Sequence, residues 1–291
     1  MNYAPIKVDL SNVWQKDFSK EPSFSSQSVI QPSENILKCL STIENSVTTP
    51  QKKKKAQPKE KPLLKISHSD DNCYEIGIDE AGRGPMFGRL YVAGVVLPKD
   101  ESFDASEIKD SKKYSSKKKI QEVYTHIKQN AIAYHVHYAE PATIDKINIR
   151  QAVLNGMREC AKEIMSTLDK KEYKNTHKHK YFIMVDGDDF KPITQFNEET
   201  NTLESIPHDT FVGGDHTYVA IAAASILAKV ERDNYILELC KTHPKLVERY
   251  GMDTHMGYGT KKHLDGIKEH GITQYHRKSY GCCKTATMNS V

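Results

Sequence analysis

The stretch GIDEAGRGP, from Gly77 to Pro85, places two adjacent carboxylates, Asp79 and Glu80, at the end of an apolar segment and follows them with a glycine-rich turn. The segment that leads into it, CYEIGID, is short and rich in β-branched and aromatic residues, which predicts a strand. Adjacent carboxylates repel each other when both are ionised, unless a cation lies between them. Glycine lets the backbone come close to a partner. We therefore expect a strand that ends in an acidic turn facing a ligand.

Three other segments predict strands of the same sheet. LYVAGVVLP, residues 90–98, is short and β-branched, and IAYHVHYAE, residues 132–140, alternates apolar and polar side chains as a half-exposed strand does. YFIMVDG, residues 181–187, is an almost continuous apolar run, which is typical of a strand buried on both faces.

Four segments have the composition or the apolar spacing of helices: residues 117–129, 143–168, 217–240 and 260–270. Ser115 and Ser116 are candidate caps of the first. The second is long enough for two helices or one bent helix, and the last ends at Gly271, a suitable C-terminal cap. Strands that precede helices indicate an α/β domain with a mixed sheet.

Composition sets the limits on domain organisation. Residues 1 to about 70 are rich in Ser, Thr, Pro, Gln and Lys, so we expect a disordered arm. Its basic block, Lys52 to Lys55, fits a nucleic-acid contact, a nuclear address or a solvated linker. The formal net charge of +4 leans mildly toward polyanionic partners. Six cysteines without C-x-x-C spacing fit a reducing compartment and argue against a structural zinc site.

The N-terminus lacks the pattern of a secretory signal, and no apolar run approaches the roughly 20 residues that span a bilayer. We therefore expect a soluble intracellular protein without membrane contact, in the cytoplasm or, for a eukaryotic or viral source, in the nucleus.

Two more acids stand where they can join Asp79 and Glu80. Asp186 ends the buried strand, and Asp215 in VGGDHTY precedes the long helix. Strand ends and a helix start can converge at one edge of a sheet, and oxygen ligands suit hard cations such as Mg²⁺. Each acid also has a simpler explanation: Asp215 as a helix N-cap, Asp186 as a turn residue, and the adjacent pair as a solvent-facing one.

Around these four acids the chain resembles bacterial-type ribonuclease HII over roughly residues 73 to 281. The motifs that carry the resemblance, in family order, are GIDEAGRGPMFGRLYVAGVVLP, DSKKYSSKKK from Asp110, IDKINI from Ile144, MVDG from Met184, GDHTYVAIAAASILAKVERD from Gly214, HMGYGTKKHL from His255 and HRKSY from His276. The resemblance implies an RNase H-like α/β fold with a central mixed sheet flanked by helices and a smaller helical C-terminal region. The implied boundaries are an arm over 1–70, a catalytic domain over 71–281 whose helical region spans about 241–281, and a flexible tail over 282–291.

By the same resemblance Asp79, Glu80, Asp186 and Asp215 are the catalytic residues and the ligands of Mg²⁺ or Mn²⁺. The implied activity is metal-dependent hydrolysis of the RNA strand of RNA–DNA hybrids. It includes nicking of duplex DNA 5′ to an embedded ribonucleotide, which leaves 3′-hydroxyl and 5′-phosphate ends. A monomer is expected, and the protein partners of the arm stay open. The alternative is a catalytically weak module that binds RNA–DNA junctions.

The resemblance also implies substrate contacts. Gly82, Arg83 and Gly84 match the family's ribose-sensing turn, and Tyr258 matches the tyrosine that stacks on the next sugar. Ser111 and Lys112 match residues near the duplex backbone, although a lysine pair before a helix is often only solvated.

Two departures accompany this match. Met256 stands where relatives usually have lysine, which predicts weaker duplex binding with a flatter salt dependence. The acidic segment 188–212 is longer than usual, and we expect it to loop out near the active-site edge.

Overall fold

A five-stranded mixed sheet, in the order β3-β2-β1-β4-β7, forms the centre of the protein. The computed structural model describes residues 64–69, 73–109, 111–114, 116–171, 181–197 and 200–290. The strands of the sheet are β1 (Tyr74–Ala81), β2 (Leu90–Val96), β3 (Ala133–Ala139), β4 (Tyr181–Asp186) and β7 (His208–Phe211). Strands β1, β2 and β3 are antiparallel neighbours, whereas β4 runs parallel to β1 and β7 parallel to β4. The predicted α/β fold with a mixed sheet is confirmed.

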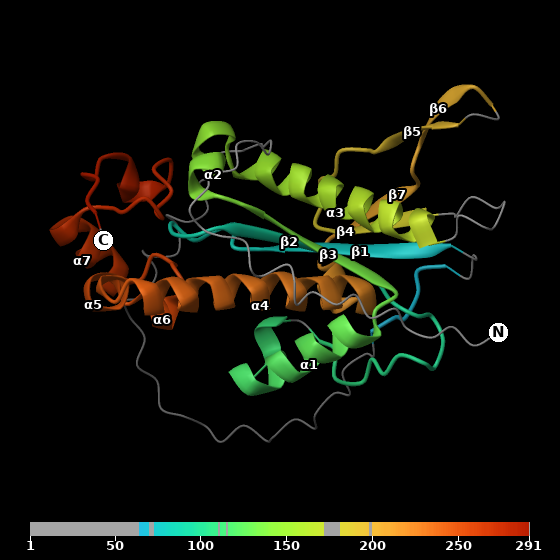
Figure 1. Ribbon diagram of the computed structural model, residues 1–291, viewed down its shortest axis with the longest axis horizontal. Coiled ribbons are helices and arrows are strands. Elements are labelled where there is room, and N and C mark those ends of the chain that lie inside the picture. Colours follow the sequence, from blue (N-terminus) through green and yellow to red (C-terminus); the bar gives the residue numbers. More distant parts are fainter. Residues whose placement is uncertain are drawn as a thin grey trace, which may run out of the picture.

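Helices cover both faces of this sheet (Figure 1). Helix α3 (Ile149–Lys171) packs on one face, while α4 (Val219–Thr242) packs on the other with α1 (Lys117–Asn130) against it. The apolar face predicted for α1 is buried, and the Ser116 side chain accepts a hydrogen bond from the backbone N–H of Lys119 as its N-cap. Each face of the sheet therefore has its own apolar core.

The segment over 143–168 forms two helices rather than one bent helix. Helix α2 (Pro141–Ile147) ends at Asn148, whose φ of 78° lies in a region that interrupts a right-handed helix, and α3 follows at once. Helix α4 runs unbroken and lies very close to the sheet: a Cβ added to Gly77 would fall 2.4 Å from the backbone carbon of Ala220. Small residues on both elements, Gly77 and Ala220, permit this approach.

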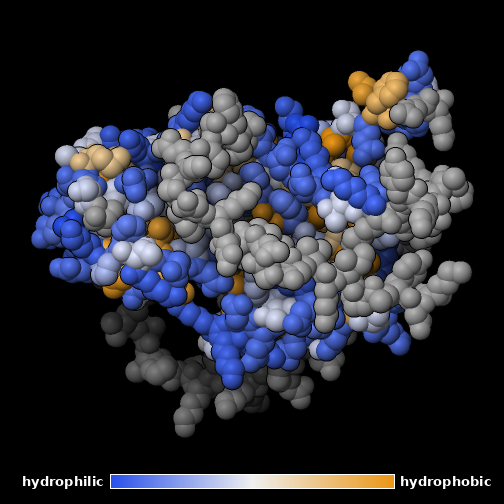
Figure 2. Space-filling view, viewed as in Figure 1, coloured by the Kyte–Doolittle hydropathy of each residue, from blue (hydrophilic) through white to orange (hydrophobic). Residues whose placement is uncertain are grey.

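Only part of the acidic segment 188–212 loops out. Residues Thr194–Asn197 (β5) and Thr202–Ser205 (β6) form a hairpin that projects from the body, with the apolar side chains of Phe196 and Leu203 exposed (Figures 1 and 2). The next residues form β7 and extend the sheet, so the expectation of a plain loop is wrong there. β7 was missed because the main chain, rather than a buried apolar pattern, pairs it with β4.

The folded part extends further toward both ends of the chain than the sequence predicts. Residues 64–69 belong to the folded part, because Lys65 N donates to Thr217 O at 2.8 Å and Val219 N donates to Lys65 O at 2.9 Å. The rest of the expected arm, with Lys52 to Lys55, lies outside the described residues. The predicted flexible tail contacts the folded part as far as Asn289, since Cys283 is buried and Asn289 N donates to Ile272 O at 2.7 Å.

The C-terminal region consists of short helices on the end of α4. They are α5 (Lys245–Tyr250), α6 (Met252–His255) and α7 (Lys261–His270), followed by the 3-10 turn η5 (Gly281–Lys284), and they enclose a third apolar core. Two histidines, His263 and His276, are buried in this region. In the part of the chain that the structure describes, no helix combines the length and the apolar character that a bilayer crossing requires.

Acid is expected to destabilise the protein through these two histidines. Burial lowers the pKa of His263 to about 4 and that of His276 to about 3, whereas in the unfolded chain a histidine titrates near 6.5. Between these values the unfolded state binds more protons, so stability is present above about pH 6.5 and is lost as the pH falls toward 4, by up to about 1.4 kcal/mol per pH unit for each histidine. Urea unfolding of wild type and His276→Asn from pH 7.5 to 4.5 measures this. An equally steep pH dependence in both proteins would contradict it.

Candidate active site

The predicted acids gather at one end of the central strands. β1 and β4 are parallel neighbours with Ile78 opposite Val185, so the next residues, Asp79 and Asp186, lie side by side. Glu80 follows Asp79 on the same strand. Asp215 lies in the 3-10 turn η4 (Gly214–His216), just before α4.

A backbone contact connects the two halves of this group. Gly214 N donates to the Asp186 carboxylate at 2.7 Å and so fixes the turn that carries Asp215 against the end of β4. Asp215 is buried, and one of its carboxylate oxygens contacts His216 Nδ1. It does not cap α4, since the N-cap is Tyr218. The simpler explanation of Asp215 as a helix cap is therefore excluded.

Electrostatics at Asp79 show how closely the acids affect each other. Burial raises the pKa of Asp79 well above its usual range, and the negative charges of Glu80 and Asp186 raise it further. Burial also raises the pKa of Glu80, with Arg83 opposing that rise. Three carboxyl groups thus share one buried site where ionisation of all three is unfavourable, and a cation would relieve the repulsion.

The donor chemistry of this site suits a hard divalent cation, because it consists of carboxylate oxygens. The side chains nevertheless have protein partners: Glu80 forms an ion pair with Arg83 at 3.1 Å, and Asp186 accepts the Gly214 amide. Within the described residues no three His, Cys, Asp or Glu side chains are already arranged to hold a metal ion.

Ser111 lies behind the acids. Its side chain is buried, and its hydroxyl lies 3.0 Å from the hydroxyl of Ser225 on α4, which in turn donates to the carboxylate of Asp79. The hydroxyls of Ser111 and Ser225 are thus hydrogen-bonded to each other beside Asp79. The serine predicted to contact the duplex thus supports Asp79 from the protein side. The side chain of Lys112 lies outside what the structure describes, and Lys113 is exposed.

The turn after the acids has one buried and one open glycine. Gly82 has a φ of 94°, and a Cβ there would fall 2.3 Å from Nε of the buried Arg232. Gly84 is exposed, and its nearest neighbour at that position is the ring of Tyr258, 3.7 Å away. The structure therefore brings the glycine turn and Tyr258 together, although more than 170 residues separate them in the chain. The Arg83 side chain is largely exposed beside them.

Arg277 is the structural support of this turn, and the sequence reasoning assigned it no role. Its guanidinium is buried and donates to Gly82 O at 2.6 Å, to Arg83 O at 3.2 Å and to Gly88 O at 3.0 Å. The hydroxyl of Tyr280 adds a bond to Arg83 O at 2.9 Å. Both residues belong to the HRKSY motif, so the signal was present in the sequence.

Met256 has a buried side chain in the C-terminal core, and its carbonyl accepts a bond from Arg232 at 2.7 Å. Its φ is 50°, a left-handed conformation. The departure at this position therefore replaces a charge with a core contact, and the expected effect on duplex binding stays a prediction.

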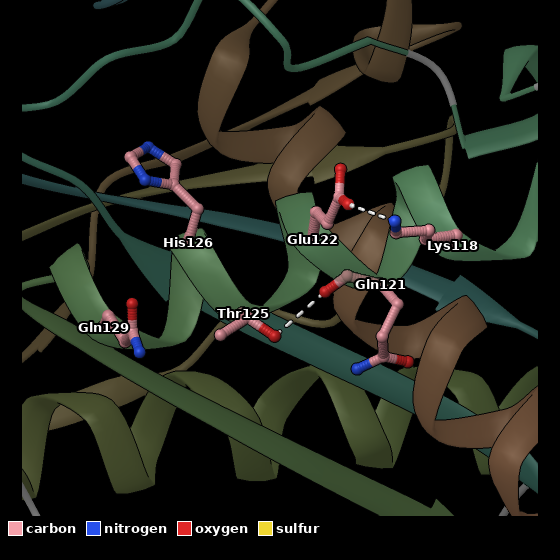
Figure 3. Close-up of a pocket in the computed structure, with 6 residues that line it drawn as sticks. All are labelled: Lys118, Gln121, Glu122, Thr125, His126 and Gln129. Carbon is pink, nitrogen blue, oxygen red and sulfur yellow. Dashed lines mark hydrogen bonds and ion pairs between the residues drawn. The ribbon is translucent and has the colours of Figure 1, made fainter.

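A separate pocket lies on the exposed face of α1, between Lys118 and Gln129 (Figure 3). Two contacts drawn there stay within the helix, because Thr125 Oγ1 donates to Gln121 O and Lys118 approaches Glu122. His126 Nε2 lies 2.9 Å from Asp104 O, outside the helix. None of the predicted site residues lines it. The candidate active site is therefore the acidic group at the ends of β1 and β4, and not this pocket.

The chain is similar to known proteins of one family. The family model described as Ribonuclease HII matches residues 76–283. The chain is 40% identical over 205 residues to the "Ribonuclease HII" of Francisella tularensis subsp. novicida (strain U112), which covers 70% of this chain and 95% of that protein. The protein of the same name from subsp. tularensis (strain WY96-3418) is also 40% identical, covering 70% and 94%.

Two solved structures share the fold. The structure of the PCNA:RNase HII complex from Archaeoglobus fulgidus superimposes with a TM-score of 0.51 at 24% identity, covering 72% of this chain and 95% of that one. Ribonuclease H2 from Pyrococcus horikoshii OT3 gives a TM-score of 0.50 at 22% identity with the same coverage.

The two glycines of the turn are expected to respond differently to alanine. Gly82→Ala should lower the free energy of unfolding by at least about 2 kcal/mol, because its φ is positive and its Cβ collides with Arg232. Gly84→Ala, whose new methyl meets only an ordinary contact with Tyr258, should cost less than about 1 kcal/mol. Urea denaturation of both variants measures the difference. Equal losses would show that the turn is not held from behind as described.

Proposed function

The chain belongs to the ribonuclease HII family and is a ribonuclease H that acts on RNA–DNA hybrids, and from this we propose that it also nicks duplex DNA on the 5′ side of an embedded ribonucleotide. The proposed products are a 3′-hydroxyl and a 5′-phosphate. The single observation that supports the proposal is the adjacency of the acidic group and the Gly82–Gly84 turn at the end of β1. A catalytic site beside a sugar-sized contact surface suits cleavage next to one particular sugar.

Asp79, Glu80, Asp186 and Asp215 are the proposed ligands of a divalent cation, on which this family depends. Such ions, when bound, activate water and stabilise the leaving oxygen in phosphodiester hydrolysis. The ion is proposed to be Mg²⁺ or Mn²⁺. The chain's own part is to keep the carboxylates together, with Ser225 holding Asp79 and the Gly214 amide holding Asp186.

The proposed sugar contact is the outer side of the glycine turn. The carbonyls of Gly82 and Arg83 point back toward Arg277 and Tyr280, so Gly84 and the ring of Tyr258 form the open side. Tyr258 is about half exposed, at 53%, which leaves one ring face accessible for stacking on a sugar. A 2′-hydroxyl is the group that separates RNA from DNA at such a place.

Charged groups complete the proposed substrate surface. Arg83 is exposed beside Glu80 and can exchange that ion pair for a phosphate when nucleic acid binds. Lys112 is proposed to lie along the duplex backbone, while Ser111 acts through Ser225 on Asp79. The monomeric state and the intracellular location stay predictions.

The nuclease proposal predicts one defined cut. Wild type should nick a DNA duplex with one embedded ribonucleotide on its 5′ side and leave an all-DNA duplex intact. Asp186→Asn should lower the rate at least about a hundredfold, because it removes a charged oxygen ligand. Asp209→Asn, the same change on the exposed face of neighbouring β7, should leave the rate unchanged. Gel analysis of end-labelled strands measures all four reactions. Tight binding without a cut would instead favour a junction-binding module.

Cation binding can be tested without turnover. Millimolar MgCl₂ or MnCl₂ should raise the melting temperature of wild type by a few degrees, because a ligand that binds only the folded state stabilises it. The Asp79→Asn/Asp186→Asn double variant should show a much smaller increase, and Asp209→Asn should behave like wild type. Differential scanning fluorimetry measures the three proteins side by side. The same increase in the double variant would place the cation elsewhere.

A further inference from the structure

A chain of hydrogen bonds leads from the main chain of Tyr258 into the C-terminal core through two buried histidines. Nδ1 of His263 lies 2.9 Å from Tyr258 O, and Nε2 of the same ring lies 3.1 Å from Nε2 of His276. At the far end, Thr273 N lies 3.0 Å from Nδ1 of His276. The rings of His263 and His276 are 0% and 1% exposed, so water does not compete for these bonds.

The backbone groups at the two ends determine which nitrogen of each ring carries its proton. A carbonyl oxygen can only accept, so His263 is protonated at Nδ1 and presents a lone pair at Nε2. A backbone N–H can only donate, so His276 accepts at Nδ1 and is protonated at Nε2. The two assignments meet in the middle without conflict, because His276 Nε2–H then donates to His263 Nε2. All bonds therefore point one way, from Thr273 toward Tyr258.

Both rings are neutral in this arrangement. Burial lowers the pKa of each histidine far below neutrality. A third histidine, His255, stacks on His263 with a ring separation of 5.2 Å and is also fixed by backbone groups, donating to Tyr250 O and accepting from Gly257 N. The cluster is thus an ordered network with every ring nitrogen engaged, which is the condition under which buried polar networks confer rigidity.

The network ends at a residue whose ring has few other constraints. Tyr258 O accepts from both His263 Nδ1 and Thr260 N, and Tyr258 N donates to His255 O. The ring itself is half exposed beside Gly84, and the guanidinium of Arg232 lies 6.0 Å from its centroid. Its position therefore depends on how firmly the main chain is held.

We propose that His263 and His276 are positioning residues, which hold the main chain of Tyr258 through this directional hydrogen-bond chain and so set its ring against the Gly82–Gly84 turn. The inference rests on the proposed role of Tyr258 in sugar recognition. Neither histidine touches the substrate; they act through Tyr258.

A double-mutant cycle tests this action. The proteins are wild type, His263→Leu, Tyr258→Ala and the double variant, and kcat/KM is measured on the duplex with one ribonucleotide. We expect Tyr258→Ala to lower kcat/KM at least about tenfold and His263→Leu to lower it about fivefold in the wild-type background but less than about twofold in the Tyr258→Ala background. His263→Asn, which keeps an amide donor where Nδ1 stood, should recover most of the loss. His270→Leu, on the same helix but outside the chain, is the matched control and should behave like wild type.

The outcomes distinguish the positioning role of His263 from sugar recognition by Tyr258. Equal losses from His263→Leu in both backgrounds, or no loss at all, would overturn the positioning role while leaving sugar recognition by Tyr258 intact. No loss from Tyr258→Ala would overturn the sugar-recognition proposal, and the positioning role with it. Circular dichroism of each variant confirms that folded proteins are compared.

A measurement on wild type needs no substitution. Long-range ¹H–¹⁵N correlation of the imidazole rings reports which nitrogen carries the proton. The expected spectrum has His263 protonated at Nδ1 and His276 at Nε2, each with a slowly exchanging proton. The opposite tautomer at either ring, or rapid exchange between both, would overturn the chain even if the variants failed to fold.

Discussion

The candidate site depends on the hydrogen bonds that the buried guanidinium of Arg277 donates. Transfer of a charge into the interior is costly unless hydrogen bonds replace those to water. Arg277 meets this condition with the carbonyls of Gly82, Arg83 and Gly88 and with the hydroxyl of Tyr280. Burial lowers its pKa only to about 10, so the group stays charged at neutral pH. Two segments almost 200 residues apart are thereby fixed to each other, and the glycine turn keeps a conformation that its own sequence would not maintain.

A second constraint arises from the pairing of β1 with β4. The parallel register sets Asp79 beside Asp186, and burial adds to the cost of ionising them. The Ser225 hydroxyl and the Gly214 amide offset part of this cost by hydrogen bonding to the carboxylates. Such a group of carboxylates has unfavourable charge interactions, which a bound cation would relieve. The neighbouring Arg83 offsets part of this cost at Glu80, which explains why the turn carries an arginine between two glycines.

Sequence reasoning predicted the elements whose apolar pattern determines their structure. The strands β1 to β4 and the helices α1 and α4 are of this kind, and the four acids followed from the resemblance. It missed elements that main-chain hydrogen bonds determine, such as β7 and the pairing of Lys65 with Thr217 and Val219. Hydrogen bonds between distant backbone segments leave little trace in composition. It also placed Ser111 on the surface and gave Arg277 no role, since buried polar residues resemble exposed ones in a sequence. Only the folded contacts, Ser111 with Ser225 and Arg277 with the turn, distinguish them.

Helix α4 contacts both the acidic group and the Gly82–Gly84 turn. Ser225 contacts the carboxylate of Asp79, and Arg232, seven residues later, lies directly under Gly82. Seven residues are almost two full turns, so both side chains leave the same side of the helix, about 10 Å apart along its axis. The helix consequently fixes the distance between the acids and the Gly82–Gly84 turn. Because one helix contacts both groups, the distance between the proposed catalytic acids and the proposed sugar-contact turn is a fixed length of the protein.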